Sequence, residues 1–344
     1  MKKLIVLFLF LLAGLTFMWA QLPDHGKKEA KKAYNQAVSL ISEGNYNEAI
    51  QYLNLSLELD ETFTDALLLK AKAKVELSDI EGALEDFNTL IFLDSSMGEP
   101  YFFTAYLNFT NDTIAGVLEN FNKAISKGFT EYQVYFYRGL YKLKAGDFSG
   151  AIVDFSESIN KKEDFARAYH ERATAKRILG DLQGALFDYR LATDYQHDFP
   201  VAFNNMGSVK KILGDYEGAL EEYNVALTLD PDFYIALNNR GTIHYFLGNL
   251  EEAMADFDLA LTIKPGYLPS KNNRASVASK NDQNALAISL FNEVVEADSS
   301  FASAWLNRGL VKELTGDLEG ACEDWSIAYE LGLEEAARYI EECK

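Results

Sequence analysis

The sequence predicts an all-α solenoid, and three observations on its 344 residues support this fold class. First, the stretch beginning at Gly214 has near-copies 34 residues earlier, at Gly180, and 34 residues later, at Gly248. Second, position 8 of each 34-residue repeat is Gly or Ala, and position 20 is Ala except for Val117 in the third repeat. Third, position 24 is always large, from Leu53 in the first repeat onwards. Small residues let two antiparallel helices cross closely, and large residues fill the space between stacked hairpins.

This pattern resembles the tetratricopeptide repeat family, whose period is 34 residues. The resemblance implies a right-handed superhelical solenoid whose first helices line a concave, ligand-binding surface. It also implies a C-terminal capping helix that ends over residues 336–344. Nine repeats follow one another without insertion or deletion, here numbered 1 to 9: 30–63, 64–97, 98–131, 132–165, 166–199, 200–233, 234–267, 268–301 and 302–335.

The N-terminus reads as a targeting segment. Lys2 and Lys3 precede an apolar run that ends near Ala20, which predicts a signal peptide over residues 1–20. An uncleaved membrane anchor facing the periplasm is the alternative, because the run is at the short limit for a span. Residues 21–29 are expected to be a mobile lead-in, and no membrane span is expected in the mature chain. We therefore expect an exported protein, periplasmic or secreted.

Charge and motif content exclude several classes of function. The chain has 32 Lys and Arg against 52 Asp and Glu, a net charge of −20, which disfavours nucleic acid as a partner. The four histidines lack metal-ligand spacing, and no nucleophile elbow or phosphate-binding loop is present. We therefore predict a non-enzymatic scaffold or adaptor without metal or cofactor, which binds a protein or an extended peptide.

Asparagines recur on the first helices of repeats 6 to 9. An amide side chain offers both a donor and an acceptor, so a row of them can bind the backbone of an extended peptide. The row resembles the asparagine ladder in the repeat superhelix of O-GlcNAc transferase. The alternative is that these amides only join neighbouring repeats. The basic residues of a carboxylate clamp are incomplete, so a C-terminal carboxylate ligand is not expected. The predicted ladder consists of Asn204, Asn205, Asn238, Asn239, Asn272, Asn273 and Asn307.

Repeats 1 to 4 instead carry apolar residues at positions 5, 9 and 12 of the first helix. This spacing keeps them on one helix face, which predicts an apolar binding groove. Tighter packing between repeats is one alternative, and a homo-oligomer interface of a self-associating structural protein is another. A third possibility is an accessory subunit of a cell-envelope enzyme or transport complex. The predicted groove residues are Phe102, Tyr106, Phe109, Phe136 and Leu140.

Cys322 and Cys343 are the two cysteines of the chain, and each stands about ten residues from the turn at Gly332. Antiparallel packing would bring them level, and an exported protein favours a disulfide between them over two free thiols. Separately, Asp112-Thr113-Ile114 resembles the acceptor motif of O-glycosylation in Bacteroidota, which makes Thr113 a candidate for modification.

A charged pair recurs within the repeats. Position 7 is often Arg and position 23 of the same repeat is usually Asp, as in Arg172 with Asp188 and in Lys70 with Asp86. This pattern predicts a structural ion pair between the two helices of a repeat, in which breaking one partner costs more than the pair contributes.

Overall fold

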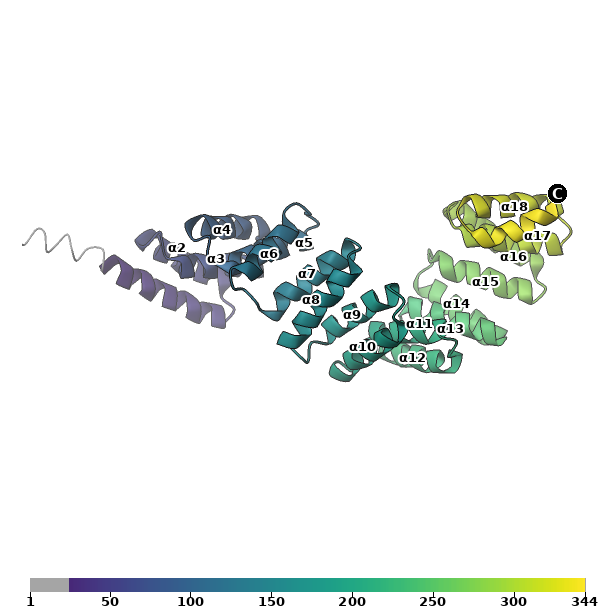
Figure 1. Ribbon diagram of the computed structural model, residues 1–344, viewed down its shortest axis with the longest axis horizontal. Coiled ribbons are helices and arrows are strands. Elements are labelled where there is room, and N and C mark those ends of the chain that lie inside the picture. Colours follow the sequence, from purple (N-terminus) through teal and green to yellow (C-terminus); the bar gives the residue numbers. More distant parts are fainter. Residues whose placement is uncertain (1–24, 344) are drawn as a thin grey trace, which may run out of the picture. The chain divides into compact units, whose positions relative to one another are not determined.

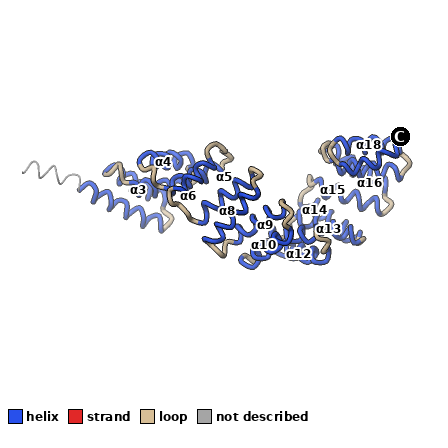
Figure 2. Tube along the Cα trace, viewed as in Figure 1, coloured by secondary structure: helices blue, strands red, loops and turns tan. Residues whose placement is uncertain are grey.

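The structure is a computed structural model that describes residues 25–343. Within this range it is all-helical and contains no strand, which confirms the predicted fold class (Figures 1 and 2). The packing divides the chain between Glu163 and Asp164 into an N-terminal half and a C-terminal half. The described residues form four helical hairpins in the first half and five in the second. The predicted signal peptide (residues 1–20) lies outside the described residues.

Each repeat contributes one hairpin of a first and a second helix. The hairpins of the N-terminal half are residues 25–42 with α2 (Tyr46–Leu59), α3 (Thr64–Glu76) with α4 (Ile80–Leu93), α5 (Gly98–Thr110) with α6 (Val117–Ser126), and α7 (Tyr132–Lys144) with α8 (Phe148–Lys161). Those of the C-terminal half are α9 (Ala166–Ile178) with α10 (Leu182–Tyr195), α11 (Pro200–Ile212) with α12 (Tyr216–Leu229), α13 (Tyr234–Leu247) with α14 (Leu250–Ile263), α15 (Leu268–Lys280) with α16 (Asn284–Ala297), and α17 (Ala302–Leu314) with α18 (Leu318–Glu330).

The first helix begins earlier than the sequence predicts. Residues 25–29, expected to belong to the mobile lead-in, are already helical. Lys and Glu in this stretch are good helix formers, so the helix extends in front of the repeat. Ala30 is fully buried, and its carbonyl accepts a hydrogen bond of 2.8 Å from the Ser56 hydroxyl on α2. This contact fixes the helix against its partner.

A left-handed residue closes the first helix of most hairpins. Gly214 has φ +81°, and the next residue, Asp215, accepts a hydrogen bond from the backbone N–H of Gly218 at the start of α12. Its side chain therefore caps the second helix. Repeats 2, 3 and 8 lack this glycine, yet Ser78, Asp112 and Asp282 adopt φ between 55° and 60° at the same position. The left-handed conformation at this position therefore does not depend on glycine.

Small residues at the helix crossing accommodate the large residue at position 24. A Cβ atom added to Gly207 would lie 2.8 Å from the ring of Tyr223, and one added to Gly309 would lie 2.5 Å from Trp325. Both aromatic side chains are fully buried. The core of each hairpin thus forms as the repeat pattern predicts.

The recurring charged pair is a buried network. Arg172 donates hydrogen bonds of 2.8 and 2.7 Å to the two carboxylate oxygens of Asp188, which is fully buried. Lys176 adds a second cation at 2.8 Å from the same carboxylate. In repeat 8, where position 23 is Leu290, Arg274 pairs instead with Asp258 of the preceding repeat at 2.6 Å.

The C-terminal cap is not the single capping helix that the sequence predicts. Three consecutive helical turns cover it: a 3-10 turn at Glu334–Ala336, α19 (Ala337–Ile340) and a 3-10 turn at Glu341–Cys343. Ala336 is fully buried against the cluster around Trp325, and the ring of Tyr339 stacks on Trp325 at 5.1 Å. The cap therefore covers the last apolar core of the C-terminal half.

Candidate functional site

The first helices of the C-terminal half form one continuous layer. Each of them contacts the first helix of the next repeat, from α9 through α11, α13 and α15 to α17. In this half of the described chain, successive second helices make no contact of similar extent. In a curved stack of hairpins, helices on the inner side lie closer to the next repeat than helices on the outer side. The first helices therefore line the concave face of this half.

The asparagines at position 5 are buried between repeats. Each accepts a hydrogen bond on its amide oxygen from the position-6 asparagine of the following repeat. The bonds run from Asn239 to Asn204 (2.9 Å), from Asn273 to Asn238 (3.0 Å) and from Asn307 to Asn272 (3.3 Å). Burial makes the prediction of a peptide-binding role wrong for Asn204, Asn238 and Asn272. Their physical role is to satisfy amides between stacked helices.

His170 continues this ladder into repeat 5, although the sequence analysis did not single it out. It occupies position 5 of α9 and is buried, and its Nε2 lies 3.0 Å from the amide nitrogen of Asn205. Its Nδ1 lies 3.1 Å from the carboxylate of Glu171. A tautomer with the proton on Nδ1 satisfies both contacts, because Nε2 then accepts from the Asn205 amide. The sequence signal for His170 is its place at position 5 of the repeat, which the buried asparagines of repeats 6 to 8 share.

The position-6 asparagines keep hydrogen-bonding capacity on the concave face. Asn205, Asn239, Asn273 and Asn307 are half-buried. Within residues 25–343, the amide oxygens of Asn239 and Asn307 accept no hydrogen bond, and each amide nitrogen donates one of its two protons. The hydrogen bonds between repeats therefore hold the amides of Asn239 and Asn307 in a fixed orientation while part of each stays available. The Asn273 amide is more fully engaged, because its nitrogen donates to Asn238 at 3.0 Å and to Thr242 at 3.3 Å.

Hydroxyl groups form a second row one helical turn further along. Ser208 and Thr242, at position 9, donate to the carbonyl four residues earlier in their own helices, at 3.0 and 2.7 Å. The phenol of Tyr223 lies 3.3 Å from the Ser208 hydroxyl, and burial raises the pKa of Tyr223 to about 12. The phenol is therefore protonated at neutral pH.

The predicted apolar groove of repeats 1 to 4 is partly filled. Phe102 and Phe136 are buried, with exposed fractions of 5 and 1 %, so the prediction that they line a binding surface is wrong. Neighbouring aromatic rings pack against both residues. Phe102 stacks on Phe129 at 4.9 Å, and Phe136 packs on Phe155 at 5.9 Å. The other predicted residues, Tyr106, Phe109 and Leu140, are half-buried.

Comparison with known families identifies the repeat. The family's sequence patterns, described as tetratricopeptide repeat or TPR repeat, match residues 33–63, 207–248, 234–267 and 272–339. These segments lie within the stretches of the chain that form the hairpins and the cap described above. The chain is a tetratricopeptide repeat protein. The tetratricopeptide repeat fold suggests that the partners of this chain are proteins or peptides.

Solved structures share the fold at low sequence identity. A tetratricopeptide repeat protein from Parabacteroides merdae is 18% identical, with 72% of this chain and 98% of that chain covered and a TM-score of 0.60. The APC/C hetero-tetramer Cut9-Hcn1 is also 18% identical, with 87% and 59% covered and a TM-score of 0.61. Pseudomonas aeruginosa pilF is 18% identical, with 61% of this chain and 95% of that chain covered and a TM-score of 0.54. At this identity the likeness shows the fold alone. No curated protein matches the sequence.

The turn that carries Thr113 borders a small cavity in this tetratricopeptide repeat protein. The cavity has a volume of about 180 Å³ and lies among Phe109, Ile114, Tyr141 and neighbouring residues. Thr113 is exposed, and its backbone N–H donates to the Asn108 carbonyl at 2.8 Å. Its side chain is accessible, and its O-glycosylation stays a prediction.

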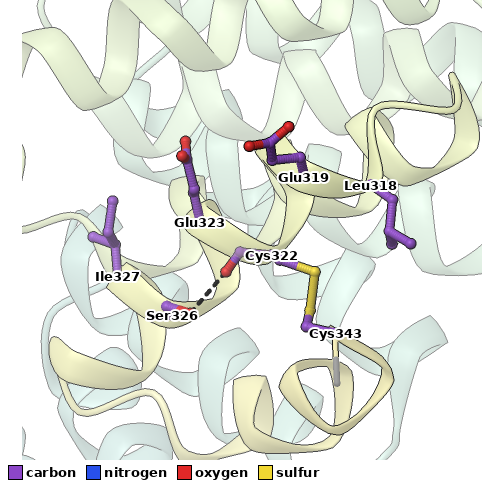
Figure 3. A pocket seen from close by; sticks show the side chains of 7 residues that line it. All are labelled: Leu318, Glu319, Cys322, Glu323, Ser326, Ile327 and Cys343. Carbon is purple, nitrogen blue, oxygen red and sulfur yellow. Dashed lines mark hydrogen bonds between the residues drawn. A yellow bond between two sulfur atoms is a disulfide. The ribbon is translucent and has the colours of Figure 1, made fainter.

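The two cysteines are joined at the C-terminal cap. Cys322 on α18 and Cys343 in the last 3-10 turn form a disulfide with a Cα–Cα distance of 5.9 Å (Figure 3). They border an open depression of about 910 Å³, which Glu319 and Glu323 also line. The disulfide ties the last turn of the cap to the last hairpin.

The described part of the chain offers neither a metal site nor a membrane-spanning helix. Among residues 25–343, no cluster of His, Cys, Asp or Glu has the composition and closeness to hold a metal ion. No helix in that range combines the length and apolarity that crossing a bilayer requires.

Proposed function

We propose that this protein is a non-catalytic scaffold that holds an extended segment of a partner protein along the first helices of its C-terminal half. The observation that carries the proposal is the row of half-buried amides at position 6, one on each of α11, α13, α15 and α17. Asn239 and Asn307 combine an unused acceptor with an unused donor proton. An extended backbone requires this pair of functions at regular intervals.

Preorganisation favours such a site. The hydrogen bonds from Asn239 to Asn204 and from Asn307 to Asn272 restrict the amide side chains before a ligand arrives. Less rotamer freedom is then lost on binding, which improves affinity for a given set of contacts. Because the amides contact the backbone of the ligand, this row contributes affinity more than sequence selectivity.

The disulfide and the N-terminal sequence support a location outside the cytoplasm. Disulfides persist in oxidising compartments, and Cys322 is bonded to Cys343. Both features favour the periplasm or the outside of the cell as the location of the scaffold. The self-association alternative is weaker, because Phe102 and Phe136, two of its proposed interface residues, are buried within the chain.

The proposal is tested by affinity capture from cell extract with the double variant Asn239→Ala/Asn307→Ala. We expect captured partner to fall at least about tenfold, since hydrogen bonds contribute about 1 kcal/mol each and several are lost. The matched comparison is Asn204→Ala/Asn272→Ala, which breaks the same bonds between repeats but keeps the Asn239 and Asn307 amides, so it should lose less captured partner than the first variant. Circular dichroism verifies that both variants fold. Partner retained by the first variant at the wild-type level would contradict the proposal.

A further inference from the structure

Cations stand on the concave face two helical turns beyond the amide row. Arg177 on α9 and Lys211 on α11 both occupy position 12, and Lys280 on α15 occupies position 13. Seven residues along a helix correspond to about 10 Å, so these cations lie within reach of a peptide that follows the amides. Their presence contrasts with the net charge of −20 for the chain.

Lys211 is a half-buried cation without an ion-pair partner in the described residues. Burial lowers its pKa, and no nearby carboxylate offsets this effect. Its neighbour Lys210 shows the usual arrangement, since it lies 2.6 Å from the carboxylate of Glu222. Removing an ammonium group from water without a compensating anion costs free energy. An anion supplied by a ligand would remove this cost.

The other two cations interact with aromatic side chains instead of carboxylates. Arg177 interacts with the hydroxyl group of Tyr189, a side chain that α10 contributes. The Lys280 ammonium lies 4.6 Å from the centre of the Tyr245 ring. Aromatic partners attract a cation but leave its charge uncancelled.

Few acidic residues share this surface. At positions 2, 5, 6, 9, 12 and 13 of α9, α11, α13 and α15, Glu171 is the one carboxylate, and it already lies against His170. The next acid at an equivalent position is Glu313 on α17, which marks the end of the positive region. The acidic residues of the C-terminal half are thus concentrated away from the groove.

Apolar side chains alternate with the cations. Ile178, Ile212 and Phe246 occupy position 13 of α9, α11 and α13, and about half of each side chain is exposed. Lys280, at position 13 of repeat 8, contacts the ring of Tyr245, at position 12 of repeat 7. Position 13 of one repeat therefore lies beside position 12 of the preceding repeat. By the same register, we expect Ile212 beside Arg177 and Phe246 beside Lys211, with the other side of the Phe246 ring stacked on Tyr216 at 6.0 Å. Each position-12 cation is therefore paired with an apolar contact surface.

We infer that the partner segment is an internal acidic stretch, with carboxylates that contact Arg177, Lys211 and Lys280 and apolar side chains that contact Ile212 and Phe246. This inference rests on the proposed function and adds the chemistry of the ligand. Neighbouring helices lie about 9 Å apart and an extended chain advances about 3.3 Å per residue, so one repeat corresponds to about three residues. Two acids about three residues apart bind Arg177 and Lys211, and a third binds Lys280 about six residues further on.

The test is selection from a random library of dodecapeptides, acetylated at the N-terminus and amidated at the C-terminus, on the immobilised oxidised protein. Blocked ends remove any contribution from a terminal carboxylate. We expect enrichment of Asp and Glu at two positions about three residues apart. A selected peptide with these acids changed to Asn or Gln should bind at least about tenfold more weakly, and raising the salt concentration should weaken the acidic peptide more than the neutral one.

Charge reversal assigns the contact to Lys211. Lys211→Glu should lower affinity for the selected acidic peptide at least about tenfold, and Lys211→Arg should retain most of it. The matched control is Lys264→Glu, an exposed lysine at the end of α14, which should bind as the wild type does. Retained peptides without acidic enrichment would overturn the inference and leave the scaffold proposal standing. Retention no higher than on a blank matrix would overturn both.

Discussion

Replacing Asp188 by Ala is expected to lower the free energy of unfolding by about 3–5 kcal/mol. The fully buried carboxylate of Asp188 holds Arg172 by two hydrogen bonds and Lys176 at 2.8 Å. Its removal leaves two half-buried cations without their anion, and uncompensated buried charge is strongly destabilising. Urea unfolding followed by circular dichroism measures the change.

An exposed ion pair on the same scaffold supplies the control. Asp258 lies 2.6 Å from Arg274, but 49% of the Asp258 side chain and 34% of the Arg274 side chain are exposed. Asp258→Ala should therefore cost no more than about 1 kcal/mol, as exposed pairs do. Equal losses for Asp188→Ala and Asp258→Ala would contradict the assignment of Asp188 as the buried centre of a charge network.

Removing the disulfide with Cys322→Ser/Cys343→Ser is expected to destabilise the C-terminal cap by about 3 kcal/mol. The two residues are 21 positions apart, and cross-linking a loop of about this length restricts the unfolded chain by that amount in the chain-entropy model. Since each repeat contacts only its neighbours, the loss should be concentrated in the last hairpin. Fluorescence of the buried Trp325 and limited proteolysis of the cap follow it.

Reductant provides the matched comparison. The wild type should lose the same stability when a thiol reductant is added, whereas the double Ser variant should not respond. Mass analysis after alkylation without reduction should find no labelled cysteine in the native protein. Two labelled cysteines, or a wild type that is indifferent to reductant, would show that the disulfide is not formed in solution.

The repeat period made most of the fold predictable. Small residues such as Gly207 can only be explained by a close helix crossing, and the ring of Tyr223 at the matching position fills the space that remains. The spacing of Cys322 and Cys343 about the turn at Gly332 predicted their pairing in the same way, because antiparallel helices bring equidistant residues level. Both features depend on the local geometry of two antiparallel helices joined by a short turn.

Burial depth on the concave face was harder to predict. Positions 5 and 6 both face the inner layer, but a rotation of one residue decides whether an amide meets the next helix or the solvent. Asn238 is therefore buried between repeats while Asn239 is half-buried at the surface. Phe102 and Phe136 were misassigned for a related reason: spacing identifies their helix face, but the size of neighbouring rings decides whether that face is covered.

Site-specific photo-crosslinking tests the central claim most directly. A photoreactive amino acid would replace Phe246 on α13, 58% exposed on the concave face, or Phe187 on α10, 62% exposed on a second helix. In cells that produce the full chain, we predict a crosslinked partner protein at position 246, joined through an acidic segment, and none at position 187. Crosslinking of the same partner at both positions, or at position 187 alone, would contradict binding along the first helices of the C-terminal half.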